Sequence, residues 1–234
     1  MALGITVAGS ENWNEISNIS EMSGYMDYIN RIGPSYLDVG TVLMAYVDDD
    51  PAGFLKIEEM DDDSVWLSGI RVLPKFRRMH VGSALTNGAM EIARRKNFRM
   101  ARLLTHRDNY NSISMVQKAQ FTKVCEMAFF RGISVDGMKT VQSLNQIPKL
   151  LNLGWKFSEP LNSLIDNATI FRSDKGAEVV EIESSFQITR WASDLEFTKE
   201  GFSCMEIYSK LPETARKYML DDFDIGLIFE KNIE

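Results

Sequence analysis

The stretch from residue 72 to residue 85 constrains the fold of this chain more than any other part of the sequence. It follows an apolar segment with the composition of a β-strand, turns at Pro74 and crosses a short basic loop. Beyond the loop, apolar residues recur at the spacing of one helix face: Val81, Leu85, Ala89 and Ile92. At a helix start several backbone N–H groups have no helical partner, and the helix dipole adds positive potential. A strand, a loop and a helix start in this order therefore predict a site for a phosphate group.

Basic side chains surround this loop. Arg77, Arg78 and His80 add donors to the backbone N–H groups. Residues 71–107 contain ten lysines and arginines but one acidic residue, Glu91, whereas the whole chain has a net charge of −7. A basic region in an acidic protein suits a small polyanion, whereas the net negative charge of the chain argues against general binding of nucleic acid or of an anionic membrane. We expect a solvated helix end at Arg94, Arg95 and Lys96.

The loop and its flanks resemble the acetyl-CoA-binding signature of the GNAT superfamily of N-acetyltransferases. The family pattern is a strand ending in apolar-x-Val, a proline, an aromatic residue, and then Arg-x-x-Gly-x-Gly/Ala at the start of a helix. In this chain the pattern runs through Ile70-Arg71-Val72, Pro74 and Phe76 to Arg77-Arg78-Met79-His80-Val81-Gly82. His80 stands where the family usually has its first glycine, so it either keeps φ negative or bears the cost of a left-handed conformation.

A second element of the same family lies downstream. Asn109 and Ser112, followed by Lys118 and Phe121, resemble the family's Asn-x-x-Ala/Ser helix that ends in Lys-x-Gly-Phe. The two elements keep the family's order and separation. The resemblance covers about residues 1–131.

The second element departs from the family at two positions. Gln120 replaces the usual glycine, and Val116 stands where many members carry a tyrosine that protonates the departing thiolate. The resemblance implies acetyl-CoA as the cosubstrate, and we expect no metal. It also implies that acetyl-CoA is contacted by Ile70, Arg71, Val72, Arg77, Arg78, Met79, His80, Val81, Gly82, Ser83, Ala84, Asn109 and Ser112. Asn109 also suits the N-cap position of the helix that follows it.

The expected elements of the first half follow from hydrophobic alternation and turn residues. They are strands at 5–8, 42–47, 53–59, 65–72, 101–106 and 121–131, and helices at 11–30, 82–96 and 110–119. The first helix is expected to break near Ser23-Gly24. This order resembles a GNAT domain, so we predict an α+β fold with a GNAT-type twisted mixed sheet flanked by helices.

The second half carries no copy of the phosphate loop. The pattern predicts a helix at 141–151, a hairpin over 168–182 and a strand at 186–191, and then a strand at 204–209, a helix at 213–220 and a strand at 225–229. The closing order echoes the C-terminal half of a GNAT domain. We predict a catalytic domain at 1–132 and a smaller C-terminal α+β domain at 133–234. The smaller domain is either a degenerate GNAT-like copy or an unrelated cap, and it shapes the acceptor pocket or a dimer interface.

The remaining composition sets the expected compartment. Cys125 and Cys204 are isolated, and the two histidines, His80 and His106, do not provide metal-ligand spacing with them. A structural zinc site is therefore not expected. No cationic leader and no run of membrane-spanning length is evident, so we expect a cytoplasmic protein.

Acetylation of an amine requires a base, because the amine is protonated at neutral pH. Glu58 and Glu59 end the strand beside the expected cofactor strand, and consecutive strand residues point to opposite faces, so only one can face the cleft. His106 is the other candidate, since imidazole titrates near neutral pH. A solvent-facing loop histidine is its alternative interpretation. We expect the acidic turns between Asp48 and Asp63 to be solvated.

The chemistry also requires a proton donor for the thiolate. Val116 cannot donate a proton, so this role passes to Tyr110, Tyr46 or water. Packing of Tyr110 against the helix is the alternative that we favour. Backbone N–H groups near Val72 are suited to stabilise the oxyanion.

The sequence therefore predicts an N-acetyltransferase. It would transfer an acetyl group from acetyl-CoA to a primary amine of a small molecule or protein, by direct attack in a ternary complex. One alternative is a catalytically weak acyl-CoA-binding module. Another is a dimerising regulatory protein, with the homodimer built through the second half.

Overall fold

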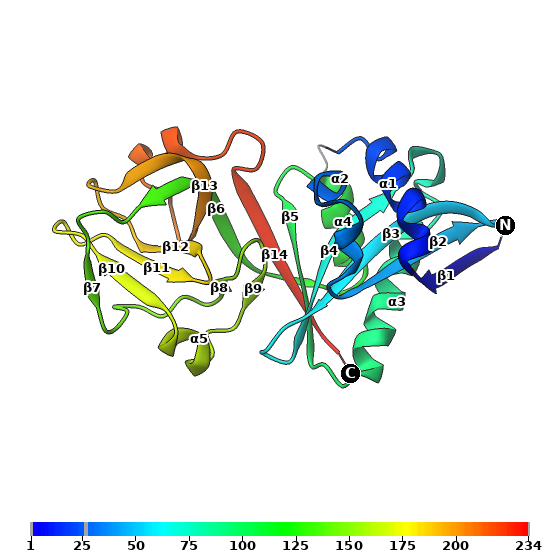
Figure 1. Cartoon of the computed structure of the whole chain (residues 1–234), viewed down its shortest axis with the longest axis horizontal. Helices are drawn as coiled ribbons and strands as arrows, with labels where there is room; N and C mark the ends of the chain where they lie inside the picture. Colours follow the sequence, from blue (N-terminus) through cyan, green and yellow to red (C-terminus); the bar gives the residue numbers. More distant parts are fainter. Residues whose placement is uncertain (1, 26–27, 234) are drawn as a thin grey trace. The chain divides into compact units, whose positions relative to one another are not determined.

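The computed structural model describes residues 2–25 and 28–233, and the chain forms two compact units (Figure 1). Unit 1 comprises Met1–Leu103, Asn111–Thr122 and Glu230–Glu234. Unit 2 comprises Leu104–Tyr110 and Lys123–Phe229. Three strands, β5 (Met100–His106), β6 (Thr122–Ser134) and β14 (Ile225–Asn232), have residues in both units.

The strands of unit 1 pair in the order of the chain. They are β1 (Leu3–Val7), β2 (Thr41–Val47), β3 (Asp50–Glu59) and β4 (Ser64–Val72), all antiparallel, followed by a parallel pairing of β4 with β5. The β2–β3 turn contains Asp48 and Asp49, both with positive φ, a conformation that aspartate tolerates better than most residues. The strands expected at 42–47 and 53–59 therefore pair across an acidic turn.

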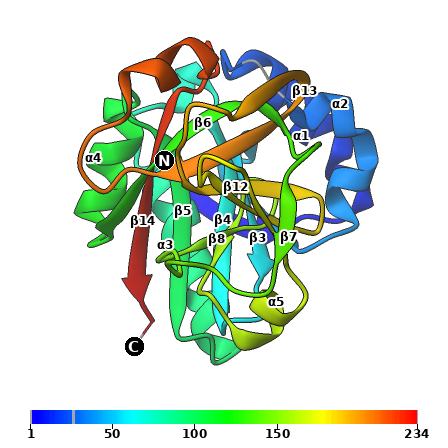
Figure 2. The ribbon, with the colours of Figure 1, turned by 90° about the vertical axis from the view of Figure 1, so that its left-hand side faces the viewer.

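Helices cover both faces of these strands (Figures 1 and 2). Alternation along the strands decides which residues meet which helix. Leu43 lies under α3 (Val81–Arg95), where a Cβ on Gly88 would come within 3.2 Å of it. Phe54 points to the opposite face and meets Tyr36 edge to face at 6.3 Å. That face carries η1 (Ser10–Asn12), α1 (Trp13–Met22), α2 (Tyr28–Ile32) and η2 (Gly33–Leu37).

The predicted helix at 11–30 is therefore divided, and part of its expected range, residues 26–27, lies outside the described residues.

A buried ion network joins three separate segments of unit 1. Arg102 on β5 is fully buried and pairs with the fully buried Asp62. It also donates to Ser64 Oγ at 2.9 Å, and its Nε lies 3.4 Å from Oε2 of Glu230 on β14. Arg102 therefore belongs to the core and not to the basic region around the loop.

Unit 2 is dominated by strands. Its order of hydrogen-bonded strands is β14-β6-β13-β12-β11-β10-β7. The remaining bounds are β7 (Lys139–Val141), β8 (Leu151–Asn152), β9 (Phe157–Ser158), α5 (Asn162–Asp166), β10 (Thr169–Arg172), β11 (Glu178–Ile182), β12 (Ser185–Arg190), β13 (Glu196–Glu206) and η4 (Glu213–Tyr218). One cluster of its core gathers around Phe130, Val179 and Ile188, and another around Leu151, Ile170 and Val180.

The second half differs locally from the predicted elements. The helix predicted at 141–151 is wrong: β7 ends at Val141, and bends and irregular residues follow until β8 begins at Leu151. Its spaced apolar residues are explained by Leu144 and Leu151, which pack together in one core cluster from an irregular segment. The segment around residues 213–220 is a 3₁₀ helix, and the strand near 204 begins earlier, at Glu196.

The last strand returns to the sheet between β5 and β6. The Phe129 N–H donates to Asp224 O at 2.8 Å, and the Leu220 N–H donates to Phe129 O at 3.0 Å. Phe130 also forms a bridge with Met219. The two ends of segment 131–218 therefore meet at neighbouring points of β6. The chain has an α+β fold with a large mixed sheet, as predicted.

Candidate active site

The loop between β4 and α3 is held by two buried apolar anchors. Leu73 and Phe76 are buried, and the short helix η3 (Pro74–Phe76) spans the turn. Arg78 and His80 then adopt positive φ values of 64° and 61°. His80 thus takes the left-handed alternative, at a cost of about 1–2 kcal/mol.

Three N–H groups precede the first hydrogen bond of α3. That bond runs from the Ala84 N–H to His80 O at 2.9 Å. The N–H groups of Val81, Gly82 and Ser83 come before it, so no carbonyl of the helix can accept from them. The side chain of His80, at the N-cap, does not cap the helix. The geometry predicted for a phosphate site is present.

Gly82 brings this helix start close to its neighbours. A Cβ there would lie 2.7 Å from Met115 Sδ of α4 (Tyr110–Lys118), 3.9 Å from Ile70 and 4.0 Å from Val72. The N–H groups of α3 and the end of β4 therefore lie side by side.

The predicted basic residues fall into two groups. The Arg77 guanidinium donates to Val72 O at 3.3 Å and to Ser23 O, and Arg71 lies over the Tyr25 ring at 4.6 Å. Arg77, Arg78 and His80 are all exposed beside the helix start. Arg77 is thus tied to backbone carbonyls although it is exposed.

The pairing of β4 changes along its length. Within the described residues, its pairs with β5 run from Ser64 opposite Met100 to Leu67 opposite Leu103. Its pairs with β3 continue as far as Val72. The register with β3 shifts at this point, and Gly69 has a φ of +59°. β4 therefore has a bulge just beyond its last pair with β5.

Glu58 and Glu59 point to opposite faces, as the alternation requires. Glu58 lies on the face of α1 and η2, with Ser68 Oγ 3.5 Å from Glu58 Oε2. Glu59 lies on the other face and pairs with Lys96 at the end of α3, where both side chains are half exposed.

His106 is engaged at both ring nitrogens within unit 2. Nδ1 accepts the Asp108 N–H at 3.2 Å, and Nε2 lies 3.0 Å from Asp224 Oδ1. These partners assign the proton of the neutral ring to Nε2. Asp224 also accepts from Arg107 at 2.7 Å and from the Ile225 N–H. His106 is thus part of a local network with Asp108 and Asp224.

The candidate proton donors are separated from one another. The favoured packing of Tyr110 is wrong, because its side chain is 73% exposed. Tyr46 donates to Glu15 Oε2 at 2.7 Å, and burial followed by this hydrogen bond raises the pKa of Tyr46 to about 12. Val116 is buried in the core, so α4 directs no proton donor from that position.

Asn109 and Ser112 stand at the start of α4. Asn109 precedes the helix and its N–H donates to His106 O at 3.0 Å. Asn109 belongs to unit 2 and Ser112 to unit 1. At the other end of α4, Gln120 has a φ of +66° and the Phe121 N–H donates to Val116 O at 3.0 Å. Gln120 therefore adopts the left-handed cap for which the family uses glycine.

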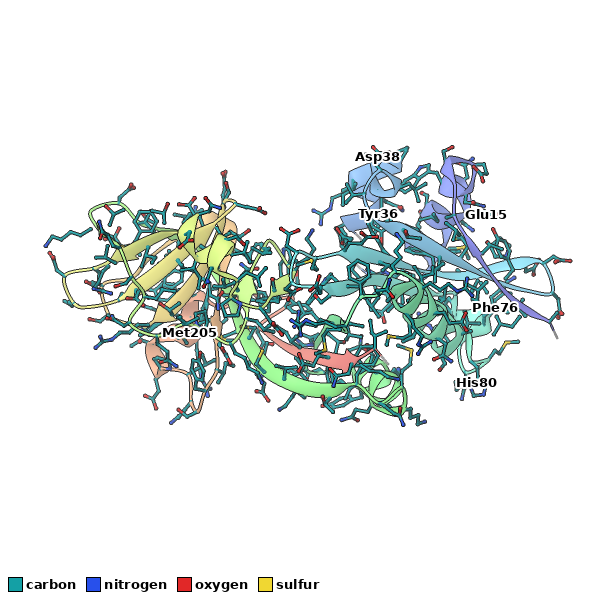
Figure 3. The ribbon with its side chains drawn as sticks, turned by 90° about the horizontal axis from the view of Figure 1, so that it is seen from below. Glu15, Tyr36, Asp38, Phe76, His80 and Met205 are labelled. Atoms are coloured by element: carbon teal, nitrogen blue, oxygen red, sulfur yellow. The ribbon has the colours of Figure 1, made fainter. Side chains whose placement is uncertain are left out.

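Three residues of this region were not found from the sequence. Lys56 is buried on the same face as Glu58, and its Nζ donates to Tyr36 O at 2.8 Å and lies 4.2 Å from the Tyr36 ring centroid. The Tyr36 hydroxyl rests against Gly69. A lysine inside the apolar run of β3 was the signal available for this cluster. Figure 3 shows Tyr36 with Glu15 above the strands of unit 1 and His80 below them.

Within residues 2–25 and 28–233, no group of three or more His, Cys, Asp or Glu side chains is arranged to hold a metal ion. In the same part of the chain, no helix is long and apolar enough to cross a membrane.

Comparison with known proteins finds a family match for part of the chain. Residues 11–121 match the model of the acetyltransferase (GNAT) family. This part of the chain, a little under half of its length, is therefore similar to GNAT acetyltransferases. No curated protein sequence matches the chain.

Solved structures extend the likeness to the whole chain. A candidate acetyltransferase from Thermoplasma acidophilum is 16% identical, with a TM-score of 0.60 over 98% of this chain and 99% of that one. The ribosomal-protein-S18-alanine N-acetyltransferase from Escherichia coli is 9% identical, with a TM-score of 0.53 over 100% and 95% of the two chains. At these identities the likeness shows the fold alone.

A third structure contains coenzyme A. The PaiA N-acetyltransferase from Thermoplasma acidophilum, solved in complex with coenzyme A, is 19% identical over 53% of this chain and 92% of its own, with a TM-score of 0.45.

Proposed function

We propose that this protein transfers the acetyl group of acetyl-CoA to a primary amine by direct attack in a ternary complex. One observation carries the proposal. A helix start with three available N–H groups lies beside a strand whose pairing with β5 ends at Leu67. The first feature suits a pyrophosphate, and the second suits an extended arm that pairs with backbone as an added strand.

Acetyl-CoA would be held along unit 1 by two sets of contacts. The N–H groups of Val81, Gly82 and Ser83, with Arg78 and His80, would bind the pyrophosphate. Residues 68–72 of β4 would pair with the pantetheine arm, and a backbone N–H there would stabilise the developing oxyanion. Asn109 and Ser112 stay proposed contacts from the resemblance.

Glu58 is the proposed base. Its carboxylate lies on the face of β3 opposite the α3 side and beside the bulge of β4. It would take the proton of the incoming ammonium group before the amine attacks. Glu58→Gln should lower turnover about 100-fold, the usual worth of general base catalysis, with little change in acetyl-CoA affinity.

Two further variants sharpen this test. Glu59→Gln decides between the neighbouring carboxylates, because it removes the one paired with Lys96 on the opposite face. Glu91→Gln, on the exposed surface of α3, controls for the loss of one negative charge. Equal losses in the Glu58 and Glu59 variants would remove the assignment of Glu58.

The burial of Val116 favours a second candidate, an acyl-CoA-binding module with little turnover. Calorimetry with acetyl-CoA, and thiol release in the presence of a panel of primary amines, separate the two functions. The proposed enzyme binds acetyl-CoA and releases thiol only when an acceptor is present. Binding without thiol release for any amine would favour the module.

A further inference from the structure

The departing sulfur of the cosubstrate needs a proton, and the tyrosines considered from the sequence are poorly placed to supply it. Tyr110 is largely exposed, and the hydroxyl of Tyr46 is already donated to Glu15. Another tyrosine of unit 1, Tyr36, has a different setting. It is 2% exposed, although its hydroxyl reaches the backbone of β4.

Gly69 defines where that hydroxyl lies. A Cβ built on Gly69 would be 2.2 Å from Tyr36 Oη, so the hydroxyl occupies the space that a side chain would need. Gly69 also has a φ of +59°, which favours glycine independently. The sequence thus keeps a glycine at a point where the Tyr36 hydroxyl touches the bulge of β4.

Lys56 fixes Tyr36 in this position. Its ammonium group donates to the Tyr36 carbonyl at 2.8 Å and lies 4.2 Å from the centre of the Tyr36 ring. Lys56 pairs with Ser68, the residue before Gly69, across the β3–β4 ladder. The tyrosine is therefore held from the strand that also supports the bulge.

The proposed path of acetyl-CoA brings its sulfur to the same point, so this inference rests on the proposed function. Pairing with β5 ends at Leu67, and the phosphate loop begins beyond Val72. The stretch available to an extended arm therefore runs from Val72 back to Ser68. Because the sulfur is the end of the arm farthest from the pyrophosphate, it falls near Gly69.

We propose that Tyr36 is the residue that protonates the departing sulfur. As the amine nitrogen bonds to the acetyl carbon, the carbon–sulfur bond breaks and its electron pair stays on sulfur. Sulfur takes the proton of the Tyr36 hydroxyl, and the Tyr36 oxygen regains a proton from the acylated nitrogen. Glu58 holds the proton removed before attack, and solvent takes it up.

The first test needs no acceptor. Calorimetry compares coenzyme A with desulfo-coenzyme A at pH 7 and pH 9, because the thiol ionises over this range and a charged acceptor strengthens the hydrogen bond. In the unaltered protein the preference for coenzyme A should rise about tenfold between these pH values. In Tyr36→Phe that rise should disappear, while the affinity for desulfo-coenzyme A is kept.

Tyr46→Phe is the matched control, since it removes a tyrosine hydroxyl from the same face. It should keep the full pH-dependent preference. With an amine that the enzyme accepts, Tyr36→Phe should also lower kcat about 100-fold with little change in KM for acetyl-CoA.

The outcomes separate the two proposals. If the unaltered protein binds no coenzyme A, the proposed function fails and the role of Tyr36 falls with it. If it binds coenzyme A but Tyr36→Phe keeps the pH-dependent preference, or keeps kcat within about threefold, only the assignment of Tyr36 is overturned. A lower melting temperature with an unchanged preference would mark the hydroxyl as structural and would overturn it as well.

Discussion

At the scale of single residues, two departures from the family pattern keep the backbone geometry that glycine would provide. His80 and Gln120 both have positive φ, at the start of α3 and after the end of α4. A residue with a Cβ in this conformation costs about 1–2 kcal/mol. At both positions the backbone therefore has the conformation that glycine would favour, although another residue is present.

Gln120→Gly should raise the free energy of unfolding by about 0.5–1 kcal/mol, because relief of the left-handed strain exceeds the added entropy of the unfolded chain. Gln117→Gly, inside the exposed side of α4, is the control and should lower it by about 1 kcal/mol. Urea denaturation measures both values. A loss of stability in Gln120→Gly would show that the strained cap contributes contacts beyond its backbone.

The sequence predicted the residues of the phosphate loop but not those of the tyrosine cluster. The loop is a local pattern, in which N–H groups, charges and a helix start lie within a dozen residues. The contact of Tyr36 with Gly69 depends on how η2 packs over a bulge, and the engagement of His106 depends on Asp224, far along the chain. Neither of these contacts produces a pattern in the local sequence.

At the scale of elements, the buried Arg102 network ties the turn before β4 to β5 and to β14. Arg102 of β5 meets Asp62 and Ser64 from one segment and Glu230 from another. Arg102→Met should lower the free energy of unfolding by about 3–5 kcal/mol, because it leaves the buried Asp62 carboxylate without its cation.

The double variant Arg102→Met, Asp62→Ala distinguishes an ion pair from general packing. It should lose clearly less stability than the sum of the two single variants, as urea denaturation would measure. Additive losses would mean that the two side chains contribute independently.

Most elements of unit 1 were predicted to within a few residues, because their turns and alternation are local. The strand expected at 65–72 is β4 (Ser64–Val72), and the helix expected at 82–96 is α3 (Val81–Arg95). The helix expected at 141–151 failed because Leu144 and Leu151 meet through a shared core and not along one helix face. The spacing of these apolar residues therefore reflects tertiary packing and not a helix face.

At the scale of the whole molecule, β14 changes how the chain can be divided. It comes from the end of the sequence but stands between β5 and β6, while Phe130 and Met219 bridge. We expect residues 131–218 to behave as an insertion in one hairpin. A cut of the chain at the domain boundary expected at residue 132 would instead remove β14, the strand that pairs with β6.

Two shortened chains test this view. Truncation after residue 132 should give a protein without cooperative thermal unfolding, because it removes β14 and the partner of Arg102 on that strand. Replacement of residues 131–218 by an Asn-Gly turn should keep cooperative unfolding and acetyl-CoA binding. Phe129 and Phe130 are changed to threonine in that variant, since both pack against the removed segment. A truncated chain that unfolds cooperatively and binds as tightly as the full chain would contradict the insertion.

The affinity of acetyl-CoA for Gly82→Asp, measured by calorimetry, tests the central claim that the start of α3 holds the cosubstrate. Aspartate in the first turn favours the helix, and its Cβ meets only the flexible end of Met115 at short range, so the fold should persist. Its carboxylate would repel the pyrophosphate, and binding should weaken at least about 100-fold. Asn87→Asp, an exposed position on the same helix, adds the same charge and should bind like the unaltered protein. Unchanged affinity in a folded Gly82→Asp variant would contradict the assignment of this loop.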